Sequence, residues 1–274
     1  ISGDVIKALI DGTHEFINRM SEVGIEIHLS GGETADVGDI VRTLDVGFTA
    51  FARIKNEDII DIQIQDGDVM VGLASFGQSV YESEYNGGMG SNGLTSARHD
   101  VFSKSLAKKY PESFDPSIPD DLVYTGTKEL TDIEPVTGLT YGKLLLSPTR
   151  TYLPVLKQLV ENLGSEIHGL IHCTGGAQTK ILNFVDNLHI IKDNLFEIPP
   201  LFKVLHVESG TEGSEMYQVF NMGHRLEVYV KPEIADKVVE FSQEFDIEAK
   251  LIGRCKAYKG KKLTIKSEFG EFEY

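Results

Sequence analysis

Three glycine-rich segments each follow a predicted strand, and this repeated arrangement constrains the fold more than any other feature of the chain. The segments lie at residues 31–32, 87–93 and 175–176. A glycine-rich loop at the end of a strand can point unpaired backbone amides outward, which suits the binding of an anion. Any one of them also fits an ordinary turn, but chance produces three less easily than one. The pattern therefore favours strand–loop–helix units that bind a polar ligand.

The first glycine segment is followed directly by acidic side chains. Alternating apolar residues predict a strand at 25–29 before it and a second strand at 44–54 after it. Glu33 and Asp36 lie in the intervening turn. Magnesium prefers a few carboxylates together with phosphate oxygens. We therefore expect Glu33 and Asp36 to hold Mg²⁺; the alternative is a tight turn with a solvated Glu33.

The composition indicates a soluble, acidic protein. The chain has 274 residues, 41% hydrophobic content and a formal net charge of −16, which allow a substantial core and two domains. The negative charge argues against nonspecific binding to nucleic acid or to an anionic membrane. Two cysteines are too few for a disulfide framework and fit a reducing compartment. With no apolar run near the ~18 residues of a membrane span and no signal peptide, we expect a cytoplasmic location.

The chain is expected to divide near residue 67. Residues 5–20 have a helical pattern and precede the two predicted strands. One helix and two strands cannot bury a core alone, so residues 1–67 are interpreted as the C-terminal part of a domain whose front is absent. Residues 68–274 form the second domain, which opens with a buried strand at 69–74.

Helices and strands interleave in this second domain, which predicts an α/β or α+β fold. We expect one helix from Leu94 to Lys109 and a long surface insertion at 110–142, which carries four prolines. Further helices are predicted at 149–163, 177–184, from 199, at 216–220 and at 232–245, and strands at 167–173, 225–230, 249–258 and 263–266.

The residues that carry chemistry exclude several kinds of site. The histidines show no His-x-x-x-His spacing and neither cysteine has a CxxC partner, so a zinc site is not expected. Cys173 has no activating base nearby in sequence and is interpreted as a buried apolar residue. His172 lies beside the third glycine loop, where it contacts ligand or serves as a hydrogen-bonded structural histidine. No Walker loop or complete GxGxxG occurs. The residues alone indicate a phosphate-bearing ligand with Mg²⁺.

Six segments in order resemble one known family. They are Gly31–Asp36, Ser91–Gly93, Leu146–Tyr152, His172–Gly176, Glu215–Gly223 and Ile252–Arg254. Together they resemble the aminoimidazole ribonucleotide synthetase (phosphoribosylformylglycinamidine cyclo-ligase) family over the chain from about residue 25. The Met-Tyr-x-x-Phe-Asn-Met-Gly and Pro-Thr-Arg-x-Tyr segments are the specific ones. Gly-Gly-Glu-Thr also occurs in selenophosphate synthetase, the hydrogenase-maturation dehydratase and other relatives.

The resemblance implies an ATP- and Mg²⁺-dependent ring closure in purine biosynthesis. ATP phosphorylates the formyl oxygen of formylglycinamidine ribonucleotide, a phosphoribosyl amidine, and a nitrogen of the same substrate then displaces phosphate. It implies two α/β domains, with the N-terminal halves of two subunits paired into a β-barrel as a homodimer. By position, Gly31, Gly32, Glu33 and Thr34 line the ATP cleft. The other implied ligand-binding residues are Ser91, Asn92, Gly93, Thr174, Gly175, Gly176 and Asn221, and His172 is the implied catalytic residue.

Two departures from the family pattern qualify this expectation. The family has a histidine where this chain has Gly90, so its role is unfilled or passes to His99 or His172. The family's N-terminal phosphate loop would precede Ile1, so we expect the 274-residue chain alone to have weak activity or none. The alternatives are a sister enzyme of the selenophosphate synthetase or hydrogenase-maturation type, and a non-catalytic ligand-binding homologue.

Overall fold

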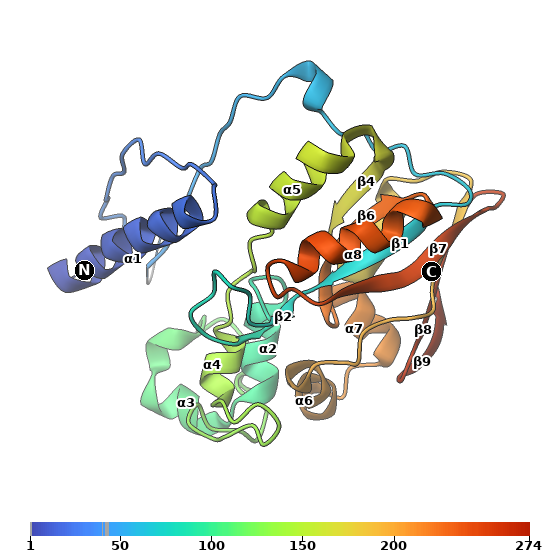
Figure 1. The fold of residues 1–274 in the computed structure, drawn as a ribbon. Coiled ribbons are helices and arrows are strands. Elements are labelled where there is room, and N and C mark those ends of the chain that lie inside the picture. Colours follow the sequence, from blue (N-terminus) through green and yellow to red (C-terminus); the bar gives the residue numbers. More distant parts are fainter. Residues whose placement is uncertain (1, 40, 42–43) are drawn as a thin grey trace.

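A seven-stranded mixed sheet forms the centre of the protein (Figure 1). The computed structural model describes residues 2–39, 41 and 44–274. The strand order is β4-β6-β1-β7-β5-β8-β9, in which β5 and β8 are parallel and the other neighbours antiparallel. The strands are β1 (Val69–Ala74), β4 (Ile167–His172), β5 (Leu188–Lys192), β6 (His224–Val230), β7 (Ala249–Ala257), β8 (Lys261–Ser267) and β9 (Gly270–Glu273), with a separate pair β2 (Phe76–Gly77) and β3 (Asn86–Gly87).

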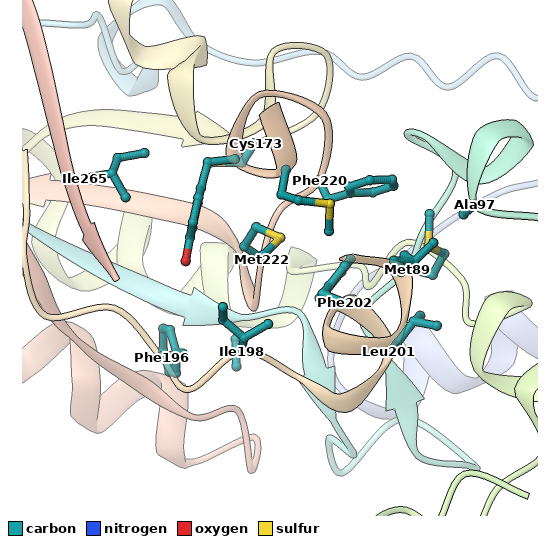
Figure 2. Packing of buried hydrophobic residues seen from close by; sticks show 14 of the residues in the cluster. Met89, Ala97, Cys173, Phe196, Ile198, Leu201, Phe202, Phe220, Met222 and Ile265 are labelled. Atoms are coloured by element: carbon teal, nitrogen blue, oxygen red, sulfur yellow. The ribbon is translucent and has the colours of Figure 1, made fainter. Parts of the chain in front are cut away.

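Helices cover both faces of the sheet. The first face packs against α5 (Leu153–Leu163), α8 (Ala235–Gln243) and the end of α1 (Gly3–Glu22). The second packs against α2 (Leu94–Val101), α4 (Tyr141–Leu145), α6 (Pro200–Ser209) and α7 (Gly213–Val219). Figure 2 shows Met89, Phe202, Phe220 and Met222 packed together in this second layer. The α/β class expected from the sequence is confirmed.

Alternation along β6 explains how one strand serves both layers. Leu226, Val228 and Val230 belong to the cluster on the first face, whereas Tyr229 belongs to the cluster on the second. Successive side chains of a strand point to opposite faces, so a strand inside a two-faced sheet is buried along its whole length. All seven residues of β6 are buried.

Most predicted elements are present. In residues 68–274, the central strand at 69–74 and the strands at 167–173, 225–230, 249–258 and 263–266 are confirmed within a few residues, and so is the helix predicted near the N-terminus. The 177–184 helix is a 3₁₀ helix, η5 (Ala177–Asn183). Four strands, β2, β3, β5 and β9, were not predicted. Further 3₁₀ turns are η1 (Asn56–Asp58), η2 (Pro111–Ser113), η3 (Asp120–Leu122), η4 (Gly164–Glu166) and η6 (Pro232–Ile234).

The strands predicted at 25–29 and 44–54 are wrong for the described residues. Both segments lie outside any helix or strand, and Phe48 and Phe51 are 71% and 87% exposed. A strand needs a hydrogen-bonded neighbour, and the alternating pattern does not supply one. Residues nearer the sheet do contact it: the Gln63 amide donates to the His168 carbonyl at 2.7 Å.

Residues 110–142 lie mostly at the surface, as predicted, but part of the segment joins the core, contrary to the prediction. Val123 and Tyr124 are 1% exposed, and Tyr141 is buried in the same cluster. The predicted 94–109 helix is also divided, into α2 and α3 (Lys104–Lys109). Phe102 is buried and extended between them, and the Ser103 hydroxyl caps α3 by accepting from the Ser105 amide. The prediction missed this packing because prolines and acidic residues dominate the segment, and only a few apolar side chains make the core contacts.

The long helix α1 attaches to the body of the protein at its C-terminal end. Met20 is 1% exposed within the first-face cluster, and Lys157 Nζ on α5 donates to the Gly24 carbonyl at 2.8 Å. Among the residues described, no helix combines the length and apolar character that a membrane span needs.

Candidate functional site

The ends of three neighbouring strands bring two of the predicted loops to one edge of the sheet. The register pairs His172 at the end of β4 with Leu226, and Ala74 at the end of β1 with His224. The loop after β4 and the segment that enters β6 therefore start side by side. The 90–93 loop joins them, because Asn92 Nδ2 donates to the Val219 carbonyl at 2.6 Å.

The 90–93 loop is held by backbone and hydroxyl contacts. The Gly90 amide donates to the Ser147 carbonyl at 3.0 Å, and the Ser91 amide lies 3.3 Å from Thr149 Oγ1. Gly93 has φ +75°, and a Cβ there would lie 2.6 Å from the ring of Phe220. Only glycine fits this position. Ser91 is exposed, so the loop presents a hydroxyl and backbone to solvent.

The Thr174–Gly176 loop presents free backbone donors. The Cys173 amide donates to the Arg225 carbonyl at 2.6 Å, which fixes the base of the loop on β6. The Gly175 and Gly176 residues are exposed, and within the described part of the chain their amides have no hydrogen-bond acceptor. Lys180 Nζ donates to Thr174 Oγ1 at 2.6 Å, so an ammonium group lies at the loop. Such a loop can bind an anion.

Asn221 lies beneath the two loops. Its Oδ1 accepts from Ser75 Oγ at 2.6 Å and from the Gly223 amide at 3.1 Å, and its Nδ2 donates to the Gly88 carbonyl at 2.8 Å. The residue is 3% exposed. These bonds link the segments that follow β1 and precede β6, which accounts for an asparagine at this position.

His172 lies at the rim of the site. Desolvation, with the cations Arg225 and Lys180, lowers the pKa of His172 to about 4. The imidazole is therefore neutral at pH 7. Its ring packs edge-on against Tyr152, with centroids 6.4 Å apart. His99, the other candidate for the displaced histidine role, is 6% exposed on α2 and stacks on Tyr124 with centroids 4.6 Å apart.

A fully buried charged network lies under the site and was missed in the sequence. Lys192 Nζ forms an ion pair with Glu227 and donates to Gln178 Oε1 at 2.9 Å. The Tyr229 hydroxyl donates to Glu227 Oε2 at 2.6 Å, and His224 Nε2 lies 2.9 Å from Oε1. Despite burial, Lys192 and the His224 contact lower the pKa of Glu227 to about 2. The sequence did contain a signal for this network, because Lys192 and Glu227 each lie within a mainly apolar strand.

Three residues of this region have atoms close enough to share a metal ion. The candidate ligand atoms of Cys173, His224 and Glu227 lie within 4.8 Å of one another. Burial raises the pKa of the Cys173 thiol well above its usual value, with Glu227 adding to the effect. The ammonium of Lys192 already pairs with Glu227. This arrangement is satisfied without a metal ion.

The Pro-Thr-Arg-x-Tyr segment has a structural role. Arg150 is 3% exposed and binds Glu82 through Nη2 at 2.6 Å and Nε at 2.9 Å. Its Nη1 donates to the Ala74 carbonyl at 2.9 Å, and the Tyr152 hydroxyl donates to the same oxygen at 2.9 Å. The segment therefore fixes the end of β1.

The first glycine segment is not joined to this site. Gly31, Gly32, Glu33, Thr34 and Asp36 are exposed and outside regular structure. Asp36 Oδ1 accepts from the Gly38 amide at 3.3 Å. Among the residues described here, no hydrogen bond or ion pair connects 31–36 with the other two loops.

A family model matches most of the chain. Residues 65–266 match the family model described as AIR synthase related protein, C-terminal domain. The chain therefore belongs to the AIR synthase related proteins through this domain.

Among proteins of this class, the chain is similar to curated relatives that share one enzyme name. A phosphoribosylformylglycinamidine cyclo-ligase of Methanocaldococcus jannaschii is 33% identical over 229 residues, which are 83% of this chain and 56% of the relative. The enzyme of the same name from Methanococcus vannielii is 30% identical over 90% of this chain and 62% of the relative. The chain thus spans little more than half the length of these curated relatives.

The solved structures to which the chain is similar are more distant in sequence. PurLQS from Thermotoga maritima is 13% identical, with a TM-score of 0.40 over 81% of this chain and 27% of that one. HypE from E. coli is 16% identical, with a TM-score of 0.38 over 78% of this chain and 50% of that one. Similarity at this level does not bear on function.

Proposed function

We propose that the protein containing this chain closes the imidazole ring of aminoimidazole ribonucleotide from formylglycinamidine ribonucleotide, using ATP. The observation that carries this proposal is the match of residues 65–266 to the AIR synthase related C-terminal domain, together with cyclo-ligase relatives at 30–33% identity. The relatives' name describes this reaction. The 91–93 and 174–176 loops, which lie at one edge of the sheet, support binding of a phosphate-bearing substrate.

The residue roles follow from where each group lies. Backbone amides of Gly175 and Gly176 bind phosphate oxygens, and Ser91 and Asn92 close the opposite side. Asn221 holds these loops from beneath rather than contacting ligand, because three protein partners already engage its amide. His172 is neutral at pH 7 and contacts the ligand as a hydrogen-bonding imidazole. Phosphoryl transfer needs such positioning more than a protein nucleophile.

The ATP and magnesium part of the proposal rests on the N-terminal segment. Gly31, Gly32 and Thr34 are proposed to line the ATP cleft, and Glu33 and Asp36 to hold Mg²⁺. Carboxylates suit this cation, which would neutralise phosphate charge when bound. Residues 1–67 and 68–274 are proposed as parts of two domains, and residues 25–54 as the surface at which two copies pair. A cytoplasmic homodimer is part of the same proposal.

The direct test is turnover by the full product of the gene that encodes this chain. We expect formylglycinamidine ribonucleotide to disappear with equal formation of aminoimidazole ribonucleotide and ADP, only when ATP and Mg²⁺ are present. The matched control is the same protein with Gly175→Val. Rapid ATP consumption with selenide or carbamoyl acceptors, and none with the amidine, would instead assign a sister reaction.

A further inference from the structure

A buried arginine without an anionic partner lies between the two loops of the site. Arg225 is 1% exposed at the start of β6. Its Nη2 donates to the Met89 carbonyl at 2.6 Å and lies 3.2 Å from the Gly88 carbonyl, whereas its Nη1 is buried with no hydrogen-bond partner. No carboxylate pairs with this guanidinium in the part of the chain that is described. Burying an unpaired charge is costly, so such a group needs a functional reason.

Arg225 contacts both loops. Its carbonyl accepts from the Cys173 amide at 2.6 Å and so fixes the base of the 174–176 loop. Its guanidinium lies against Gly90, where an added Cβ would lie 2.7 Å from Nη1. A side chain at position 90 and this guanidinium therefore cannot occupy the same space. Beside the 90–93 loop, the positive charge is therefore supplied by Arg225 on β6, and not by a side chain at position 90, where the family has a histidine.

A second cation lies at the same place. Lys180 Nζ donates to Thr174 Oγ1 and has no carboxylate partner among the residues described. Both Lys180 and Arg225 contribute to the lowered pKa of His172, as expected for two positive charges near one imidazole. Neither cation is neutralised by a carboxylate among the described residues, although the chain as a whole has a net charge of −16. They leave a local excess of positive charge beside free backbone amides.

We propose that Arg225, with Lys180, binds the phosphate group of the ligand directly. The proposal rests on the function proposed above and adds the side chains that recognise the phosphate. Guanidinium binds phosphate oxygens through parallel N–H donors, and Nη1 has donors to offer. Because Nη1 is closed to solvent, the 88–93 loop must shift when the anion enters.

The test is phosphate binding by the 274-residue chain, measured by isothermal titration calorimetry with inorganic phosphate. We expect Arg225→Met to weaken binding about tenfold or more, since hydrogen bonds to charged groups are the strong ones. Lys180→Met, at a partly exposed position, should weaken it several-fold with little risk to folding. The matched control, Lys237→Met, removes an exposed cation on α8 and should leave the dissociation constant unchanged.

A second readout separates ligand binding from a purely structural role. Phosphate should raise the NMR titration midpoint of His172 in the wild type, because a nearby anion favours the imidazolium. In Arg225→Lys, which keeps a charge but loses the planar fork, this response should be smaller. Unchanged phosphate affinity in a folded Arg225→Met variant would overturn the proposal. Absence of phosphate binding by the wild type would overturn it as well.

Competition distinguishes the source of the phosphate. Displacement of inorganic phosphate by ribose 5-phosphate, and not by ADP, would assign the site to the sugar phosphate. The reverse would assign it to the nucleotide, and both results support an anion ligand. Arg225-dependent binding without ring closure by the gene product would retain this inference and remove the proposed reaction.

Discussion

A lysine and a glutamate lie side by side at the centre of this sheet, both with fully buried side chains. Glu227 is accommodated because Lys192, His224 and Tyr229 occupy its two oxygens. The desolvation cost of the pair is high, and its attraction compensates only while every partner is present. Removing one member leaves the other as an isolated buried charge. Arg225, two residues away on the same strand, lacks such a set of partners.

We predict that Lys192→Met destabilises the protein by about 3–5 kcal/mol, measured by urea unfolding at pH 7. The control Lys143→Met breaks an exposed pair with Glu84 and should cost less than about 1 kcal/mol. The folded-state pKa of Glu227 is about 2, below the usual carboxyl pKa of 4.5, so its contribution to stability is present above pH 4.5 and is lost as the pH falls toward 2. Equal costs for the two variants would contradict this account.

The loops show how the elements of the sheet build the site. Each loop begins where a strand ends, and the antiparallel register of β4 and β6 sets the start of the 174–176 loop beside the entry to β6. The two loops are connected through residues 219–221. Asn92 donates to the Val219 carbonyl, and Gln178, which follows the 174–176 loop, donates to the Asn221 carbonyl. Gly175 and Gly176 differ in what they tolerate. Gly176 has φ +81°, whereas an added Cβ at Gly175 meets nothing within 4 Å.

This difference makes Gly175→Val the cleaner substitution. We predict that it leaves the thermal midpoint within about 2 °C of the wild type, because nothing in the fold occupies the new volume. It should abolish detectable phosphate binding, because the side chain covers the exposed amides. Gly47→Val, in an exposed segment with equal free space, is the control and should bind normally. Retained binding in Gly175→Val would exclude the loop as a phosphate site.

At the scale of the whole molecule, two regions differ sharply in packing. Residues 69–274 share one sheet with covered faces, whereas residues 44–54 belong to no helix or strand (Figure 1). Apolar side chains of this segment, such as Phe48 and Phe51, are exposed. An extended segment with free backbone groups and apolar side chains can pair with another chain. The proposed homodimer would use this surface.

We predict rapid amide hydrogen exchange at residues 44–54 in dilute solution and slow exchange in β1. Unpaired backbone is open to solvent, while the β1 amides are in the centre of the sheet. If two copies pair through this segment, its protection should rise with protein concentration and that of β1 should stay constant. Strong, concentration-independent protection at 44–54 would show that the segment is paired within a single chain.

The sequence by itself determined the central strands, most helices and the two glycine loops of residues 68–274, because apolar periodicity and strand-end glycines are local signals. It also determined the family, through motifs such as Met216–Gly223. Only the tertiary structure decided that residues 110–142 join the core, since a few apolar side chains find their partners far away in sequence. It likewise placed Lys192 against Glu227 and left Arg225 unpaired, because burial and partner distance depend on strand order. The strand predictions at 25–29 and 44–54 failed for the same reason. An alternating apolar pattern is a local signal, whereas a strand also needs a partner strand, which the tertiary structure does not provide there among the residues it describes.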